Sequence, residues 1–233
     1  MPAAGERETS STPCNVYSLK RGKRVMTVKI QEILEILQRH IHSAVFATMG
    51  RDGMPQTRAI DIMLTGEGSL YFLTARGKEF YRQLEEQGFV ALTGVKDGKS
   101  VTLRGKIRPA SRDLLEPIFI ENPYMESLYP EKTRDALEVF ELYEGQGEYF
   151  DLTQRPIYRQ GFALGEKREA SGGYEIGTAC TGCGKCLEAC PQRCVDLSRV
   201  PAVILQEHCL HCGRCVDCCP AGAIIKREED GHG

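Results

Sequence analysis

Cysteine is concentrated in one short segment near the end of the chain. Ten of the eleven cysteines lie between Cys180 and Cys219, in two copies of the spacing Cys-x-x-Cys-x-x-Cys-x-x-x-Cys-Pro that are offset by 29 residues. The whole segment, about 55 residues long, is too short to bury much of a hydrophobic core. Bonds made by the cysteines are therefore expected to hold this part of the chain together.

The spacing predicts iron–sulfur clusters. Three cysteines on a tight turn supply three thiolates to a cubane cluster, and a distant cysteine completes the set. Tandem runs of this kind commonly exchange their fourth ligands. The predicted ligands of the first 4Fe–4S cluster are Cys180, Cys183, Cys186 and Cys219, and those of the second are Cys209, Cys212, Cys215 and Cys190. The chain is thus predicted to move electrons.

Other uses of cysteine explain this spacing less well. A disulfide framework suits a small secreted domain, and the sequence has no recognisable signal peptide. Structural zinc also uses Cys-x-x-Cys pairs, but it requires neither the third cysteine nor the Cys-Pro in both copies. A Rieske-type centre would replace two cysteines by histidines. His208 and His211 flank Cys209, but all eight cysteine positions are filled, so we interpret both histidines as incidental.

Aligning the two copies with each other separates ligands from bystanders. At the offset of 29 residues, Cys218 falls opposite Ala189, and Cys194 falls opposite Ala223. Because alanine stands at each position in the sister copy, we interpret both cysteines as small packing residues. The other matched pairs are Gly184 with Gly213, which suits a backbone curled around a cluster, and Lys185 with Arg214, which we interpret as solvated.

The rest of the chain is long enough for a second, larger domain. The 233 residues carry a formal charge of −2, which indicates no nucleic-acid partner, and no apolar run is long enough to predict a membrane span. Thiolate clusters belong in a reducing compartment, so a cytoplasmic location is expected. The expected organisation is a disordered tail at 1–25, a barrel domain at 26–166, a connector at 167–175 and a cluster domain at 176–230.

Between residues 27 and 166, short apolar segments alternate with turn signals. Apolar residues from Ile30 to Ile41 recur at helical spacing and predict an amphipathic helix that ends near residue 42. So many short antiparallel strands predict a barrel or a sandwich. Strands are expected at 44–49, 56–64, 70–74, 89–95, 100–108, 137–143, 148–152 and 157–164, a second helix at 77–87, and a partly helical insertion at about 111–137.

This domain resembles the pyridoxamine 5′-phosphate oxidase-like flavoproteins. The resemblance rests on residues 56–60 and 70–74, then on Gly77, Lys78 and Leu84, with further likeness at 128–132 and 139–142. It implies a split β-barrel, a homodimer, and FMN bound between the subunits. The fold class expected for the whole chain is mainly β, a split β-barrel with flanking helices, followed by a small α+β ferredoxin-like iron–sulfur domain.

The resemblance also implies which residues contact FMN. Arg58 is suited to fork onto the phosphate, Lys78 to add a point charge, and Thr74 to complete an anion site at a helix start. Taken singly, each of the two cations is better explained as a solvated surface charge, and it is their combination in this order that favours FMN. The full predicted set is Arg58, Ala59, Ile60, Asp61, Thr74, Ala75, Lys78 and Thr102.

Related barrels bind other cofactors, which leaves alternatives open. Deazaflavin is one, and haem is another, with His40 or His42 as an axial ligand. We interpret these histidines instead as the end of the first helix, where a cation complements the helix dipole. The oxidase that makes pyridoxal phosphate carries a Ser-Arg-Lys triplet where this chain has Gly77-Lys78, so pyridoxamine phosphate is not the expected substrate.

Together the two domains predict an oxidoreductase that depends on FMN and iron–sulfur clusters. Clusters exchange single electrons, whereas a flavin can collect two and act on a small organic substrate or an external electron carrier. No catalytic acid or base is assigned, although Asp61, Tyr71 and Tyr129 are candidates. The main alternative is an electron carrier or redox sensor with no substrate of its own. A weaker alternative is a barrel that has lost its flavin and only anchors the clusters.

Overall fold

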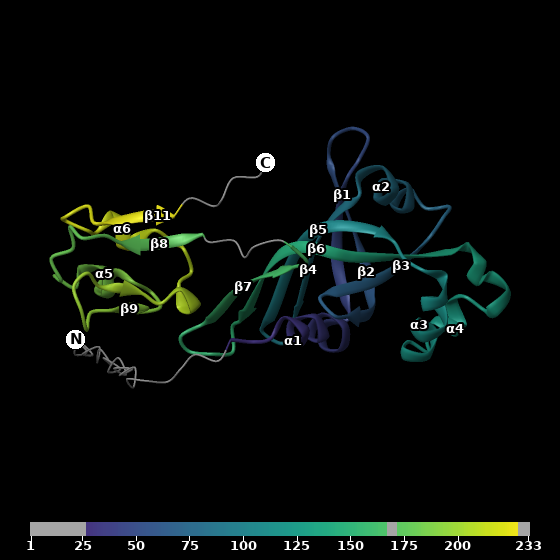
Figure 1. Cartoon of the computed structure of the whole chain (residues 1–233), viewed down its shortest axis with the longest axis horizontal. Helices are drawn as coiled ribbons and strands as arrows, with labels where there is room; N and C mark the ends of the chain where they lie inside the picture. Colours follow the sequence, from purple (N-terminus) through teal and green to yellow (C-terminus); the bar gives the residue numbers. More distant parts are fainter. Residues whose placement is uncertain (1–26, 167–171, 228–233) are drawn as a thin grey trace, which may run out of the picture.

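The computed structural model describes residues 27–166 and 172–227. The predicted disordered tail at 1–25, with Cys14, and residues 167–171 of the predicted connector lie outside these ranges. The described chain forms a large unit of β-strands and a small cysteine-rich unit beside one end of it (Figure 1). Within these two ranges, no helix is long and apolar enough to cross a membrane.

The large unit is a barrel of antiparallel strands. Its strands pair in the order β3-β2-β1-β4-β5-β6-β7, and β3 also pairs with β6. Six strands therefore close on themselves, while β7 extends the sheet beyond β6. The predicted split β-barrel is confirmed. The strands are β1 (Ser43–Met49), β2 (Pro55–Gly66), β3 (Ser69–Ala75), β4 (Phe89–Lys96), β5 (Lys99–Pro109), β6 (Leu137–Asp151) and β7 (Tyr158–Leu164).

Closure of the barrel depends on β6. The sequence predicts two strands here, at 137–143 and 148–152, but the structure has one strand of 15 residues. Its first half pairs with β3 and its second half with β7, while β5 follows it along the whole length. Glycines allow β5 and β6 to approach each other closely: a Cβ on Gly105 of β5 would lie 2.1 Å from the backbone oxygen of Glu144 on β6. A break in the apolar alternation at these glycines made one bent strand resemble two.

Aromatic side chains fill the barrel. Phe46, Phe72, Phe140 and Phe162 are fully buried, and the rings of Phe46 and Phe72 lie 4.8 Å apart. The predicted first helix is present as α1 (Ile30–Glu35), which continues as the π-helical η1 (Ile36–Ile41) and packs its apolar face onto this core.

A second apolar cluster lies on the other side of the barrel wall. There the predicted insertion folds over β2, β3 and β6, and Ile118 packs with Leu73 and Val139. The remaining helices of this unit are α2 (Glu79–Gln87), η2 (Arg112–Leu114), α3 (Leu115–Glu121), α4 (Met125–Leu128) and η3 (Glu131–Ala136).

The cysteine-rich unit is built from two small two-stranded antiparallel sheets joined by cysteine loops. Strand β8 begins at Gly173, three residues before the boundary expected at 176, because Gly173–Ile176 pairs with Ile224–Arg227. Its core contains Cys186, Cys194 and Cys209 among a few apolar residues. Its elements are β8 (Gly173–Ile176), α5 (Lys185–Ala189), β9 (Val195–Asp196), β10 (Val203–Ile204), η4 (Gln206–His208), α6 (Arg214–Asp217) and β11 (Ile224–Arg227).

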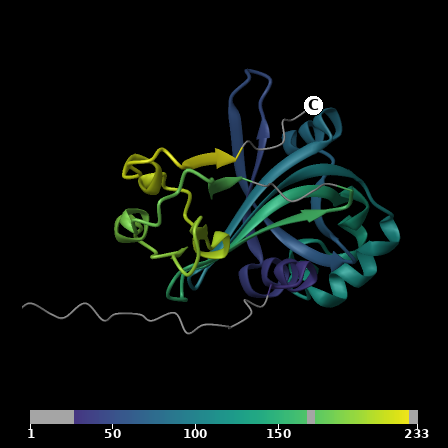
Figure 2. The same cartoon turned by 60° about the vertical axis from the view of Figure 1, so that its left-hand side comes forward.

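The two units touch through η4 and β7. Figures 1 and 2 both place η4 against the barrel and the loop between β8 and α5 at the far end of the small unit. The two cysteine runs therefore differ in their distance from the barrel.

We predict that Gly105→Ala destabilises the barrel by about 2 kcal/mol or more, because the added methyl group would collide with backbone that cannot move aside. Gly77→Ala is the matched control, since nothing lies within 4 Å of a Cβ at that position. Unfolding in urea, followed by far-UV circular dichroism, measures both. Equal urea midpoints for the two variants would contradict this account of the close approach between β5 and β6.

Candidate iron–sulfur and flavin sites

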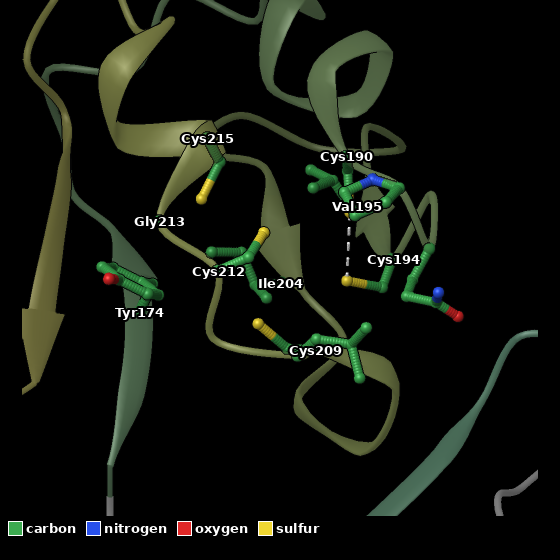
Figure 3. Close-up of a pocket in the computed structure, with 12 residues that line it drawn as sticks. Tyr174, Cys190, Cys194, Val195, Ile204, Cys209, Cys212, Gly213 and Cys215 are labelled. Carbon is green, nitrogen blue, oxygen red and sulfur yellow. Dashed lines mark hydrogen bonds between the residues drawn. The ribbon is translucent and has the colours of Figure 1, made fainter. Parts of the chain in front are cut away.

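The structure brings the eight matched cysteines into two groups of four. One pocket is lined by Cys180, Cys183, Cys186 and Cys219. A second pocket is lined by Cys209, Cys212, Cys215 and Cys190 (Figure 3). These are the two sets that exchange of the fourth ligand predicts. Below, they are called the first and second cysteine pockets.

Local backbone geometry explains how each run curls around its pocket. Gly184 and Gly213 have φ of 79° and 77°, in the left-handed region that glycine adopts at low cost. Each glycine immediately precedes a short helix, α5 or α6, that carries the third cysteine of its run. The predicted role of these glycines in turning the backbone is therefore visible at both sites.

The pockets have the chemistry of cluster sites. Each gathers four cysteines from two separate parts of the chain, and four thiolates are the ligand set of a 4Fe–4S cluster. In the described residues, no three Cys, His, Asp or Glu are grouped as donors to a single metal ion. That result does not test a cubane, in which each thiolate bonds a different iron atom.

Cys194 lies closer to the second pocket than a packing role requires. It lines that pocket, and its Sγ lies 3.5 Å from Sγ of Cys190. A hydrogen bond with Cys209, together with burial, raises the pKa of the Cys194 thiol. The same bond lowers the pKa of Cys209, against the effect of burial. The pair therefore favours the thiolate on Cys209 rather than on Cys194, and the thiolate is the form that binds metal.

The predicted flavin residues divide between the outer and the inner face of the barrel wall, and successive residues of β2 point to opposite faces. Ala59, Asp61 and Thr102 point outward. Ala59 pairs with Val45, Val45 with Thr93, and Thr93 with Thr102, so a row crosses the outside of four strands over about 14 Å. Ile60 points inward and packs against the barrel core.

Arg58 also points inward, beneath α2. Its Nη1 donates to Oγ1 of Thr48 at 2.5 Å, and its Nη2 donates to Oε1 of Gln83 at 3.0 Å. The guanidinium lies 4.5 Å from the ring centroid of Phe80, and burial lowers the pKa of Arg58. The interpretation of Arg58 as a solvated surface charge is therefore wrong, because the side chain belongs to a half-buried polar network.

Thr74, Ala75 and Lys78 lie where β3 leads into α2. The hydroxyl of Thr74 is buried and has no hydrogen-bond partner among the described residues. Lys78 is exposed, and as the N-cap residue it makes no side-chain bond to the helix. The first N–H groups of α2 and the unpartnered hydroxyl of Thr74 lie at the same junction as Lys78, and Arg58 lies beneath the first turn of α2. This combination fits an anionic group such as a phosphate.

The structure also brings together residues that sequence reasoning did not combine. The hydroxyl of Tyr124 donates to Oδ2 of Asp61 at 2.5 Å and lies 3.2 Å from Nε2 of His42. Burial, and then the bond to Asp61, raise the pKa of Tyr124. His42 has a φ of 66°, which is strained for a residue with a side chain. Tyr124 is 63 positions from Asp61, so no local sequence signal could have linked them.

Comparison with known families agrees with this architecture. A model of the pyridoxamine 5′-phosphate oxidase family matches residues 26–145. The chain belongs to this family. A 4Fe-4S dicluster domain matches residues 179–224 of the same chain. No curated protein matches the chain.

Several solved structures are similar to the barrel. A NimC/NimA family protein from Clostridium acetobutylicum is 21% identical, with 57% of this chain and 92% of that chain covered and a TM-score of 0.49. A pyridoxamine 5′-phosphate oxidase-related, FMN-binding protein from Nostoc punctiforme is 15% identical, with 58% and 94% covered and a TM-score of 0.41. PhzG from Burkholderia lata is 14% identical, with 56% and 80% covered and a TM-score of 0.42.

We predict that Cys190→Ala removes about half of the bound iron, because the second pocket loses its fourth ligand. Cys194→Ala is the matched control: it removes a neighbouring thiol from the same pocket and should leave the iron content unchanged. Iron and acid-labile sulfide analysis of anaerobically purified protein measures both. Iron loss in Cys194→Ala and not in Cys190→Ala would reverse the assignment.

Proposed function

We propose that the protein is an oxidoreductase in which electrons pass between two 4Fe–4S clusters and FMN, and in which the FMN reduces or oxidises a small organic substrate. When bound, the clusters supply single electrons and the flavin supplies two-electron chemistry. The observation that carries the proposal is the joining of two four-cysteine pockets to a barrel of the pyridoxamine 5′-phosphate oxidase family, in one chain and in direct contact.

The chain's own residues supply two functions that FMN binding needs. Arg58, Lys78 and the start of α2 offer positive charge and open N–H groups to the phosphate. The outer row from Ala59 to Thr102 offers a flat, small-residue surface to a ring. Because the phosphate-binding residues and the outer row lie on opposite faces of the barrel wall, we propose that a second subunit completes the site.

Exposed apolar residues on the outer face of β1 and β4 support a homodimer. Val45, Met49 and Val95 are 51%, 46% and 64% exposed, and Phe89 is 44% exposed. All four belong to neighbouring strands and alternate with residues that point into the barrel. An apolar sheet face of this kind is covered in most proteins, and a second copy of the chain is the cover that we propose.

One arrangement favours an enzyme over a carrier without a substrate. Asp61 lies on the outward face of the strand that is proposed to run along the flavin ring, and it accepts a short hydrogen bond from Tyr124. Tyr124 keeps its phenolic proton at neutral pH, as any phenol does, and its raised pKa makes it a weak acid that releases the proton only to a strongly basic atom. We propose that Tyr124 protonates such an atom of a reduced substrate, and His42 lies within reach to replace the proton.

We predict that Lys78→Ala weakens FMN binding by about tenfold or more, because a charge-assisted contact to the phosphate is lost. Lys132→Ala removes an equally exposed lysine from the insertion and serves as the control. Flavin fluorescence titration of the reconstituted apoprotein measures both. Unchanged FMN affinity in Lys78→Ala would contradict the phosphate site, and failure of the unaltered chain to bind FMN would support a barrel that only anchors the clusters.

We predict that Tyr124→Phe lowers kcat for reduction of a quinone, nitro-aromatic or enoate by about tenfold or more, because the proton source is removed. Iron and flavin contents should not change. Tyr129→Phe removes the other tyrosine of the insertion, which the sequence also offered as an acid, and should leave kcat unchanged if Tyr124 is the proton source. Steady-state turnover under anaerobic conditions measures the effect. If the unaltered protein turns over none of these acceptors faster than free FMN, the carrier alternative replaces the enzyme.

A further inference from the structure

The junction between the two units is made by a few directed contacts. The backbone of Ile157, just before β7, is held at both its polar atoms. Its N–H donates to Oε1 of Gln192 at 3.0 Å, and its carbonyl accepts a hydrogen bond from Nδ1 of His208 at 2.9 Å. His208 is therefore not incidental, as the sequence suggested, because it joins the small unit to the barrel.

Arg159 on β7 reaches from the barrel into the second cysteine run. Its Nη1 donates to Nε2 of His211 at 2.6 Å, and its Nη2 forms an ion pair with Glu148 on β6. Its side chain is only 16% exposed. Since guanidinium stays charged at any ordinary pH, a largely buried positive charge stands next to the loop between Cys209 and Cys212.

His211 occupies a strained position in that loop. Its φ is 53°, and the residue at the matching position of the first run, Gly182, has a φ of 71°. Both loops thus need a left-handed residue here, which glycine provides without strain and histidine does not. The ring is held between Arg159 and Tyr174, whose ring centroid lies 6.4 Å away. The contact with the barrel is the feature that distinguishes this run from its sister copy.

The first cysteine run has a different setting. Its loop lies at the end of the small unit that points away from the barrel, and Cys183 is exposed. Both pockets are lined by residues of the small unit alone, and the exposed Lys185 lies on the rim of the first. The second pocket has no charged residue in its own lining, and what distinguishes it is the charge of Arg159, which the barrel brings to the loop of its run through His211.

We propose that Arg159 is a positioning residue that holds the second cysteine pocket against the barrel and places a positive charge beside it. The cluster bound by Cys190, Cys209, Cys212 and Cys215 is then the one next to the barrel, and electrons enter or leave the protein at the first pocket. This assignment rests on the proposed function, because it requires both pockets to hold clusters.

The proposal has a consequence for the reduction potentials. Reduction adds one negative charge to a cluster, so a nearby positive charge stabilises the reduced form and raises the potential. Glu148 lies beside Arg159 and partly offsets that charge. Removing the positive charge should lower the potential of the second cluster, and removing the negative charge should raise it.

The test is a redox titration of the reconstituted holoprotein, monitored by electron paramagnetic resonance. Arg159→Gln should disfavour reduction of one cluster by about tenfold, which is about 59 mV for a one-electron couple. Glu148→Gln should shift the same couple in the opposite direction, and Arg159→Lys should retain most of the potential of the unaltered protein. Cys183→Ala, which damages the first pocket, identifies the shifted couple as the one that remains.

Arg108→Gln is the matched control. Arg108 is also a strand residue paired with a glutamate, Glu141, but it lies near the opposite end of β5 from the junction. Its loss should shift neither couple. Shifts of the same sign in Arg159→Gln and Glu148→Gln, equal shifts of both couples, or no shift would overturn the proposal. Iron analysis separates failure of this inference from failure of the proposed function, because a chain that binds only one cluster contradicts the proposed function itself.

Discussion

Each cysteine run completes the pocket of the other. Cys190 follows the first run in the chain but lines the second pocket, and Cys219 does the reverse. Neither pocket can form from one run alone, so the two halves of the small unit must fold together. The antiparallel pairing of β8 with β11 joins the start of this unit to its end, which brings Cys219 back to the first run. Metal binding and folding of this unit are therefore expected to be a single process.

The same arrangement decides how the unit meets the barrel. Of the two pockets, the second lies nearer to β7, because η4 and the loop of the second run contact that strand. The loop of the second run carries His211 toward Arg159, and the short η4 places His208 on the backbone of Ile157. A connector alone would leave the units free to move relative to each other. These directed contacts fix the second cysteine pocket next to the barrel and leave the first cysteine pocket away from it.

Much of the architecture was predictable from local patterns. Strand alternation and turn residues located most of the barrel, and the cysteine spacing located both pockets together with the crossing of their fourth ligands. The single strand β6 was missed because glycines at its bend interrupt the apolar pattern, as a turn would. The setting of Arg58 was missed because a positive side chain on a strand gives no sign of whether it faces solvent or a polar network inside the barrel.

By itself, the sequence determined the eight cysteines, their division into two sets, and the family of the barrel. These features depend on short-range spacing, which the order of residues records directly. Only the tertiary structure decided that Tyr124 reaches Asp61, that Cys194 stands beside the second pocket, and that Arg159 stands beside one cysteine run and not the other. Such contacts join residues far apart in the chain, and they exist only once the barrel has closed and the small unit has packed against it.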